Sequence, residues 1–287
     1  MTITFNTSHK QFTAIKCLAL GALLLLLSMA TYAGGRPVGK HRLFINIGAS
    51  YFFNHQFWDQ NGQVQNYAFN ERNSSLSASI SAEYGFSRRV SLMASVPFVS
   101  NMVRSDISNS TINTLGDGQI GVRYYLANIA YRTYFSIQGN LIFPLYVNTA
   151  AVTRGYGELG SSIQLAAAGD FNMLSKSFFF EVDLSTSQYF GGDAPLQGQF
   201  TASIGTSLAK KLQLSLSESS ATSYSITKTF NPASPAPAKD YSSNEVTAGL
   251  SYGLGHSRSL SLSYTTFISG KNTAIGSSVS LGYGYKF

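Results

Sequence analysis

The sequence is poor in charged residues. Asp, Glu, Lys and Arg make up only 11% of its 287 residues, whereas soluble domains contain about 25%, so an ordinary water-facing surface is excluded. The mean hydropathy of +0.03 is nevertheless too low for a bundle of membrane-spanning helices. Few charges, 13% aromatic residues and a neutral average hydropathy indicate a wall that is apolar on one side and polar on the other.

Long apolar runs are also scarce. Only residues 17–27 are continuously apolar; two lysines precede them and a run rich in small residues, ending at Ala33, follows. This stretch is shorter than the roughly 20 residues that a membrane-spanning helix requires, and its flanks match a secretory signal peptide. We therefore expect residues 1–33 to be a cleaved signal peptide rather than a retained anchor, with Ala30 as the alternative cleavage point.

Cysteine is nearly absent. The single Cys17 lies in the segment expected to be removed, so the mature chain would have neither a disulfide nor a cysteine-based metal site. Removal of Lys10 and Lys16 lowers the formal net charge from +7 to +5, because residues 1–33 contain no Asp or Glu. Nothing in the composition divides residues 34–287, which we expect to form a single domain.

The mature sequence instead alternates apolar and polar residues. Between Ser75 and Tyr84, for example, serine or glutamate alternates with an apolar residue at every position. Alternation in segments of about ten residues separated by turns is typical of transmembrane β-barrels. The sequence therefore predicts an all-β fold, a transmembrane antiparallel up-and-down β-barrel of about twelve strands. The expected strands cover residues 42–53, 74–84, 89–99, 117–126, 132–145, 158–171, 177–187, 198–208, 211–218, 244–254, 258–267 and 274–287.

The connections between these segments alternate in length. Short ones are expected at 85–88, 127–131, 172–176, 209–210 and 255–257, and long ones at 54–73, 100–116, 146–157, 188–197, 219–243 and 268–273. Bacterial outer-membrane barrels have short periplasmic turns and longer extracellular loops, so both chain ends are expected on the periplasmic side. Each short turn carries a basic residue at or beside it, which indicates either a cationic rim that meets lipid phosphates or simply solvated turns.

An exported β-sandwich is the soluble alternative, because it would show the same alternation and turn spacing. The outward faces of its strands would carry charged residues. The polar faces here consist mainly of Ser, Thr, Gly, Gln and Asn. The barrel is therefore the favoured fold.

The chain ends in an alternating aromatic pattern. Ser280, Gly282, Tyr285 and Phe287 have the spacing of the C-terminal recognition signal of outer-membrane barrels, which this segment resembles. The resemblance implies an assembly signal that the barrel-assembly machinery reads. It also implies localisation in the outer membrane of a Gram-negative bacterium, in contact with outer-membrane lipid.

A second resemblance lies in the middle of the chain. The segment from Leu115 to Leu126 opens with Leu-Gly-Asp and ends in Arg-Tyr-Tyr-Leu, and Val96-Pro97-Phe98-Val99 places a proline before an aromatic at a strand end. These motifs resemble the outer-membrane β-barrel family named for the meta-pathway of phenol degradation. The resemblance covers roughly residues 75–180, and it implies a porin or transporter for small organic or aromatic compounds.

Motifs of catalysis and of nucleic-acid binding are lacking. A serine hydrolase needs a histidine base beside its nucleophile, but of His41, His55 and His256 only His55 is expected near the loops. Metal-ligand spacings, phosphate-binding glycine loops and nucleic-acid-binding modules are not found. We therefore expect no enzymatic activity, no cofactor, no metal and no nucleic-acid partner.

Charged and amide residues on the polar faces are the candidates for a pore lining. The candidate pore-lining residues are Arg123, Glu181, Asp183, Asp117, Glu158, Gln138, Gln164 and Glu245. Arg123, Glu181 and Asp183 lie near mid-strand and are candidates for a constriction. Acidic residues outnumber basic ones on the inward faces, which favours mild cation preference, unless loop arginines such as Arg104 and Arg154 fold inward and neutralise them.

The same alternation predicts which side chains face lipid. Leu76, Ile80, Val122 and Leu262 are expected to touch lipid, whereas Ser77, Ser79 and Ser261 are expected to line the interior together with Arg123. Three functions remain open at this point. The first is passive movement of small solutes through a channel or transporter. The second is a structural or adhesive barrel that acts through its extracellular loops, and the third is an outer-membrane enzyme.

Overall fold

The computed structural model describes residues 36–287 with the exception of residues 108, 149–154, 174–175, 227, 229 and 233–237. The expected signal peptide, residues 1–33, lies outside this part of the chain. No helix within the described residues is long and apolar enough to cross a lipid bilayer.

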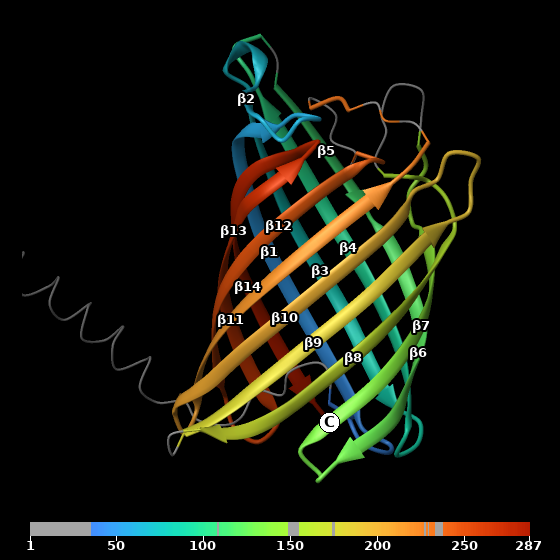
Figure 1. The fold of residues 1–287 in the computed structure, drawn as a ribbon, viewed down its shortest axis with the longest axis vertical. Coiled ribbons are helices and arrows are strands. Elements are labelled where there is room, and N and C mark those ends of the chain that lie inside the picture. The colour runs from blue at the N-terminus through green and yellow to red at the C-terminus, as the bar shows by residue number, and fades with distance from the viewer. Residues whose placement is uncertain are drawn as a thin grey trace, which may run out of the picture.

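Twelve long strands form one closed sheet (Figure 1). They are β1 (Leu43–Trp58), β3 (Arg72–Gly85), β4 (Val90–Arg104), β6 (Asp117–Ile129), β7 (Thr133–Pro144), β8 (Gly160–Met173), β9 (Lys176–Tyr189), β10 (Leu196–Ala209), β11 (Leu212–Tyr224), β12 (Tyr241–Gly253), β13 (Arg258–Lys271) and β14 (Thr273–Lys286). Each pairs antiparallel with the next, and β14 pairs with β1 from Phe44–Lys286 to Trp58–Thr273. The closure confirms the predicted antiparallel barrel of about twelve strands.

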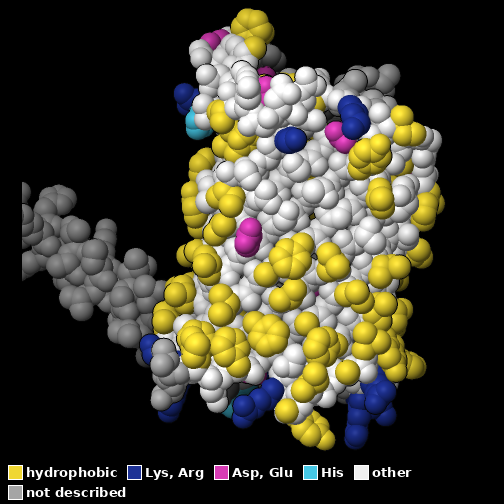
Figure 2. Space-filling model, in the orientation of Figure 1, with side chains coloured by type: hydrophobic (Ala, Val, Ile, Leu, Met, Phe, Trp, Pro, Cys, Tyr) yellow, Lys and Arg dark blue, Asp and Glu magenta, His cyan; other side chains and the backbone are white. Residues whose placement is uncertain are grey.

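The outside of the barrel is apolar because successive side chains of a strand point to opposite faces. Four side chains that the sequence predicts to face lipid are between 43% and 58% exposed, namely Leu76, Ile80, Val122 and Leu262. Figure 2 shows apolar side chains spread over the wall and Lys and Arg side chains near its lower and upper edges. The inward positions carry small polar residues such as Ser79.

One end of the barrel, here called the turn end, carries the tight connections at residues 86–89, 130–132, 210–211 and 254–257. The last pair of β8 and β9, Met173 with Lys176, lies at the same end. Both ends of the barrel sequence meet there, because the Phe287 N–H donates to the Leu43 carbonyl at 2.8 Å. Exposed basic side chains surround this end; they are Arg88, Arg89, Arg132, Lys176, Lys210 and Arg258. The opposite end, here called the loop end, carries the longer connections.

Two connections at the loop end are more ordered than the sequence predicts. β1 continues to Trp58 and pairs with the short β2 (Val64–Asn66), and β4 continues to Arg104 and pairs with β5 (Asn109–Leu115). The assignment of 54–73 and 100–116 as loops is therefore partly wrong. The two hairpins extend the wall beyond the rest of the loop end (Figure 1). Alternation does not reveal them because β2 and β5 carry polar residues on both faces.

The expected long loop at 268–273 is wrong. β13 runs to Lys271 and β14 begins at Thr273, so only Asn272 connects them. Asn272 has a φ of 50°, a left-handed conformation that Asn adopts more readily than most residues. Its backbone N–H donates to the Asp59 carbonyl at 3.2 Å, and its side-chain amide donates to the Asp240 carbonyl at 2.9 Å. Two neighbouring loops therefore hold this turn in place.

Candidate functional site

The lumen contains a buried polar network centred on Arg123. Its Nη1 lies 3.1 Å from Glu83 Oε2, and its Nε donates to Gln138 Oε1 at 2.9 Å. The Tyr125 hydroxyl donates to the other oxygen of Glu83 at 3.2 Å. The charged side chains of Arg123 and Glu83 are only 8% and 9% exposed, so the ion pair is shielded from bulk water.

Strand geometry explains how this ion pair forms. Glu83 lies on β3 and Arg123 on β6, with β4 between them. The residue of β4 that pairs with Arg123 is Ser91, which is almost completely buried. Because Ser91 is small, the long Arg123 side chain can extend past β4 to reach Glu83.

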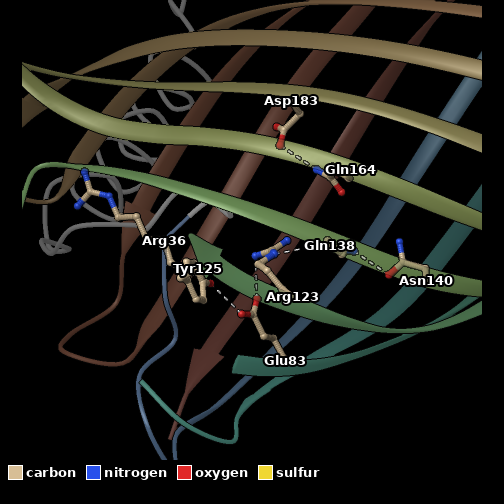
Figure 3. Close-up of polar contacts among 8 residues, drawn as sticks. All are labelled: Arg36, Glu83, Arg123, Tyr125, Gln138, Asn140, Gln164 and Asp183. Atoms are coloured by element: carbon tan, nitrogen blue, oxygen red, sulfur yellow. Dashed lines mark hydrogen bonds and ion pairs between the residues drawn. The ribbon is translucent and has the colours of Figure 1, made fainter. Parts of the chain in front are cut away.

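The network continues along the wall over β7 and β8. Gln138 Nε2 donates to Asn140 Oδ1, and Asn140 Nδ2 donates to Ser162 Oγ, both at 2.8 Å. Glu83, Arg123, Tyr125, Gln138 and Asn140 are called the Arg123 cluster below. Nearby on β8 and β9, Gln164 Nε2 donates to Asp183 Oδ1 at 2.8 Å (Figure 3). Charged and amide groups therefore line the lumen side of β3 and of β6 to β9.

The start of the described chain reaches this cluster. The Tyr125 hydroxyl oxygen also lies 3.1 Å from the Arg36 carbonyl oxygen, and the Arg36 guanidinium forms an ion pair with Asp170. Val38 is 7% exposed. The segment before β1 therefore packs against the inner wall near the turn end.

The structure brings together only some of the candidate pore-lining residues. Arg123 and Gln138 are hydrogen-bonded to each other, and Gln164 and Asp183 form a second pair on the same wall. The alternation of residues 75–84 predicts an inward-facing position for Glu83, but it does not identify Glu83 as the partner of Arg123. Alternation gives the direction of a side chain, but the partner depends on how three strands are aligned.

The other candidates lie apart from this cluster. Glu181 is half-buried on β9, and Glu245 is half-buried on β12, opposite Ser219 of β11. Glu158 is exposed and precedes the start of β8 at Gly160. Its expected place on a strand is therefore wrong, because β8 begins two residues later than the pattern indicates.

Asp117 belongs to an aromatic cluster at the loop end. Its Oδ2 accepts a hydrogen bond from the Tyr189 hydroxyl at 3.2 Å, and the rings of Tyr189 and Tyr156 lie 4.8 Å apart. The Tyr156 hydroxyl donates to the Ala238 carbonyl at 3.0 Å, and burial raises the pKa of Tyr156. Asp117 thus lies with the loops and not at mid-lumen.

The wall across β13, β14, β1 and β3 has small inward-facing side chains and no charge among its lining residues. Ser50, Ser79, Ser261 and Gly282 are among those that line a shallow space of about 250 Å³. Ser280, part of the predicted assembly signal, donates from its hydroxyl to that of Ser50 at 2.8 Å. Because these side chains are small, they leave free space in the lumen beside this part of the barrel, which is called the serine wall below.

The rest of the predicted assembly signal lies on β14 or just after it. Gly282 also faces the lumen, whereas Phe287 is exposed and its ring lies 4.3 Å from that of Tyr285. The Arg258 guanidinium lies 5.5 Å from the centre of the Tyr285 ring. These contacts place the aromatic pair at the turn end.

A cavity of about 420 Å³ lies at the loop end. Four aromatic residues line it, namely Phe52, Tyr67, Phe230 and Tyr241. Phe57 links two of them, with ring centres 5.0 Å from Tyr67 and 5.6 Å from Phe230. This cavity cannot be predicted from the sequence, because its residues come from loops and strand ends that meet only in the folded barrel.

One carboxylate faces outward. Glu218 has the same parity on β11 as Leu214 and Leu216, and it is exposed between Ala202 of β10 and Val246 of β12. The outward position of Glu218 can be predicted from the sequence, because the alternation of β11 places residue 218 on the apolar side. Glu218 is therefore not part of the lumen.

The histidines do not form a catalytic arrangement in the described residues. His41 and His256 lie beside the turn end, and His55 lies on β1 toward the loop end. His41 Nδ1 lies 3.4 Å from the Tyr84 hydroxyl. Within the part of the chain that the structure covers, no group of three or more His, Cys, Asp or Glu side chains could hold a metal ion.

Comparison with known proteins gives a likeness of fold. No protein-family model matches the sequence, and no curated protein matches it. The structure is similar to that of an outer membrane channel from Pseudomonas putida F1, with a TM-score of 0.66 and 10% identity over 90% of this chain and 100% of that chain.

Two further solved structures are less similar. The NanC porin has a TM-score of 0.49 and 9% identity over 85% of this chain and 100% of that one. The translocator domain of the autotransporter NalP from Neisseria meningitidis has a TM-score of 0.48 and 14% identity over 98% of each chain. The first of these likenesses shows that the chain shares its barrel fold with an outer-membrane channel.

Proposed function

We propose that this protein is an outer-membrane channel or transporter for the passive movement of small solutes. The observation that carries the proposal is a closed twelve-stranded wall that is apolar outside and polar inside. A closed barrel leaves no unpaired strand edge, so its backbone can lie in lipid without loss of hydrogen bonds. A wall with this polarity encloses a path for polar solutes and keeps it apart from the lipid.

The strand number fits a narrow passage. Eight strands leave room only for side chains, whereas 16 to 18 strands leave a wide aqueous channel. A barrel of twelve strands lies between these limits, and the Arg123 cluster narrows it on one side, whereas the serine wall leaves space. Small solutes are therefore the expected substrates. The motif resemblance at Leu115–Leu126 supports membership of the family named for the meta-pathway of phenol degradation, with small organic or aromatic compounds as its substrates.

Placement in the bacterial outer membrane is part of the proposal. The signal-peptide pattern at residues 1–33 supports export, and the pattern from Ser280 to Phe287 supports recognition by the barrel-assembly machinery. The turn end would then face the periplasm and the loop end the exterior. Deletion of Phe287 is expected to lower the amount of folded protein in the outer-membrane fraction, and an unchanged amount of heat-modifiable barrel would contradict this role.

Conductance in a planar lipid bilayer tests the channel function. Purified, folded protein should give discrete current steps whose size is reproducible from one insertion to the next. A preparation that shows heat-modifiable mobility, and is therefore folded, yet gives no steps would overturn the proposal. The Arg123→Gln variant is a useful companion, because a change in step size would place the conducting path beside the Arg123 cluster.

A structural or adhesive barrel is the second candidate, and one observation favours it. The β1–β2 and β4–β5 hairpins project beyond the rest of the loop end (Figure 1) and expose Val64 and Ile107. Phe69, which follows β2, is also exposed. Phe69 has a φ of 54°, which is unusual for a bulky residue. Shortening the hairpins tests this candidate, since adhesion would be lost while conductance would remain.

A further inference from the structure

The cavity at the loop end has the size and the construction of a small-molecule site. Its volume of about 420 Å³ falls in the range of about 300–1,000 Å³ that such sites occupy. Residues from β1, β3, β4, β12 and β14 and from the loop between β11 and β12 line it. Segments from both ends of the sequence therefore converge on one cavity.

The lining of this cavity is uncharged. Among the described residues that line it, none is Asp, Glu, Lys, Arg or His. Its polar groups are amides and hydroxyls, and burial raises the pKa of the Tyr67 hydroxyl, which therefore stays neutral. A charged ligand would lose its hydration without gaining an opposite charge. The cavity therefore favours an uncharged ligand.

Three asparagines in the lining each donate a hydrogen bond from the side-chain amide nitrogen. Nδ2 of Asn54 donates to the Tyr67 hydroxyl at 3.3 Å, and Nδ2 of Asn73 donates to Glu71 Oε1 at 3.0 Å. Nδ2 of Asn272 donates to the Asp240 carbonyl at 2.9 Å. Because a carboxylate and a carbonyl oxygen can only accept, the bonds to Glu71 and Asp240 fix the orientation of the Asn73 and Asn272 amides. In all three asparagines, these bonds leave the amide oxygen unused.

The three amide oxygens are unused acceptors. In Asn54, Asn73 and Asn272, Oδ1 is buried and accepts no hydrogen bond from the residues that the structure describes. Asn54 and Asn272 are each only 6% exposed. Buried acceptors normally have a partner, and three of them around one cavity match a ligand that carries several hydrogen-bond donors.

The aromatic residues of the lining indicate that the ligand also has apolar surface. Phe52, Tyr67, Phe230 and Tyr241 give the cavity apolar surface on several sides, and binding sites typically combine such surface with a few placed polar groups. We propose that this cavity binds an uncharged polyhydroxylated solute, a neutral sugar or a polyol, on its way into the lumen. The inference rests on the proposed channel function for its biological meaning, whereas the binding itself does not require transport.

Trp58 provides a reporter for this binding. It is the only tryptophan in the chain, it is 8% exposed, and it pairs across strands with Thr273, which lines the cavity. The mature barrel, folded in a detergent that contains no sugar, is titrated with glucose and with sorbitol. Gluconate serves as the charged probe and phenol as the aromatic probe with one hydroxyl. Tryptophan fluorescence and titration calorimetry are recorded for each.

The expected result is saturable binding of glucose or sorbitol, with gluconate and phenol at least tenfold weaker. Binding of neither glucose nor sorbitol by either method would overturn the inference. If phenol binds and neither glucose nor sorbitol does, the ligand is not a polyhydroxylated solute and the inference is overturned. Gluconate binding as tightly as glucose would overturn the argument from the uncharged lining.

Variants test whether binding occurs in this cavity. Asn54→Leu and Asn73→Leu each remove one acceptor with little change of volume, and each should weaken binding about tenfold, the equivalent of about 1.4 kcal/mol. Asn244→Leu is the matched control, because the Asn244 amide hydrogen-bonds Ser269 outside the cavity. Should Asn54→Leu fail to fold, Phe230→Ala alters a loop residue and should also weaken binding. Wild-type affinity in every folded cavity variant would overturn the assignment.

Conductance of the same preparation separates the two proposals. A barrel that conducts but binds neither glucose nor sorbitol overturns the inference and leaves the channel function standing. A barrel that binds glucose or sorbitol but does not conduct overturns the channel function and leaves the binding site standing.

Discussion

The Arg123 cluster and the loop-end cavity are both polar regions inside the barrel, yet they differ in how far their hydrogen bonds are satisfied. In the cluster, Arg123 and Gln138 each hydrogen-bond to neighbours on adjacent strands, and both Glu83 oxygens accept a bond. In the cavity, Asn54 and Asn272 keep buried amide oxygens for which the described residues offer no donor.

This difference follows from where each region lies. The cluster is built on the interior of long paired strands, whose fixed alignment lets side chains meet at hydrogen-bonding distance. The cavity is built on strand ends and loops. A satisfied buried network makes a wall rigid, whereas unused acceptors beside an open space can bind a solute. The cluster therefore holds the barrel together, and the cavity is the better candidate for recognition.

Removal of Arg123 is expected to have the largest effect. Arg123→Ala leaves Glu83 buried without its ion-pair partner, and breaking a buried pair in this way costs about 3–5 kcal/mol of unfolding free energy. Urea unfolding from lipid vesicles, followed by Trp58 fluorescence, measures the loss. The Arg123→Gln/Glu83→Gln double variant carries no unpaired charge and should recover much of the stability. Equal losses in the two proteins would show that the ion pair is unimportant.

Glu218 tests whether a charged residue lowers stability on the outside of the wall. Unlike Glu83, it stands among apolar neighbours on the outward face, where a charge is costly in lipid. Glu218→Leu should raise the unfolding free energy in vesicles by about 1 kcal/mol. Glu218→Gln, with no charge but the same size, should give part of this gain. A decrease in stability would mean that Glu218 is stabilised by its surroundings.

Stability should change little when an acceptor is removed from the cavity. Asn54→Leu loses the bond to Tyr67, about 1 kcal/mol, but it also removes an unsatisfied buried oxygen, which costs a similar amount. We expect a net change within about 1 kcal/mol in the same urea titration. A loss as large as that of Arg123→Ala would contradict the comparison, since the cavity would then be as structural as the cluster.

The smallest expected effect is on ion selectivity. Gln164 is neutral, so its hydrogen bond does not neutralise the Asp183 carboxylate on the lumen wall. Walls of one sign concentrate the opposite ion, and we expect mild cation preference from the reversal potential in a salt gradient. Asp183→Asn with Glu181→Gln should reduce it. An anion-selective channel, or a reversal potential that the double variant leaves unchanged, would refute this prediction.

Much of the barrel is determined by the sequence alone. Period-two alternation predicts the strands and their inward and outward faces, because a strand that lies between lipid and a polar interior must alternate. The expected strand at 117–126 and the observed β6 at Asp117–Ile129 differ only at one end. The strand bounds are predicted least well where a strand extends beyond the lipid and no longer has to alternate. β11 continues from the expected end at 218 to Tyr224, through polar residues on both faces.

The tertiary structure alone decided which side chains meet. The sequence places Arg123 inward, but its partner Glu83 lies 40 residues away and is reached across a strand that carries the small Ser91. The cavity depends on Tyr67, Phe230 and Asn272, which come from three separate loops. Alternation is a local property of one strand, whereas these contacts depend on register, on barrel closure and on loop packing, which no single segment encodes.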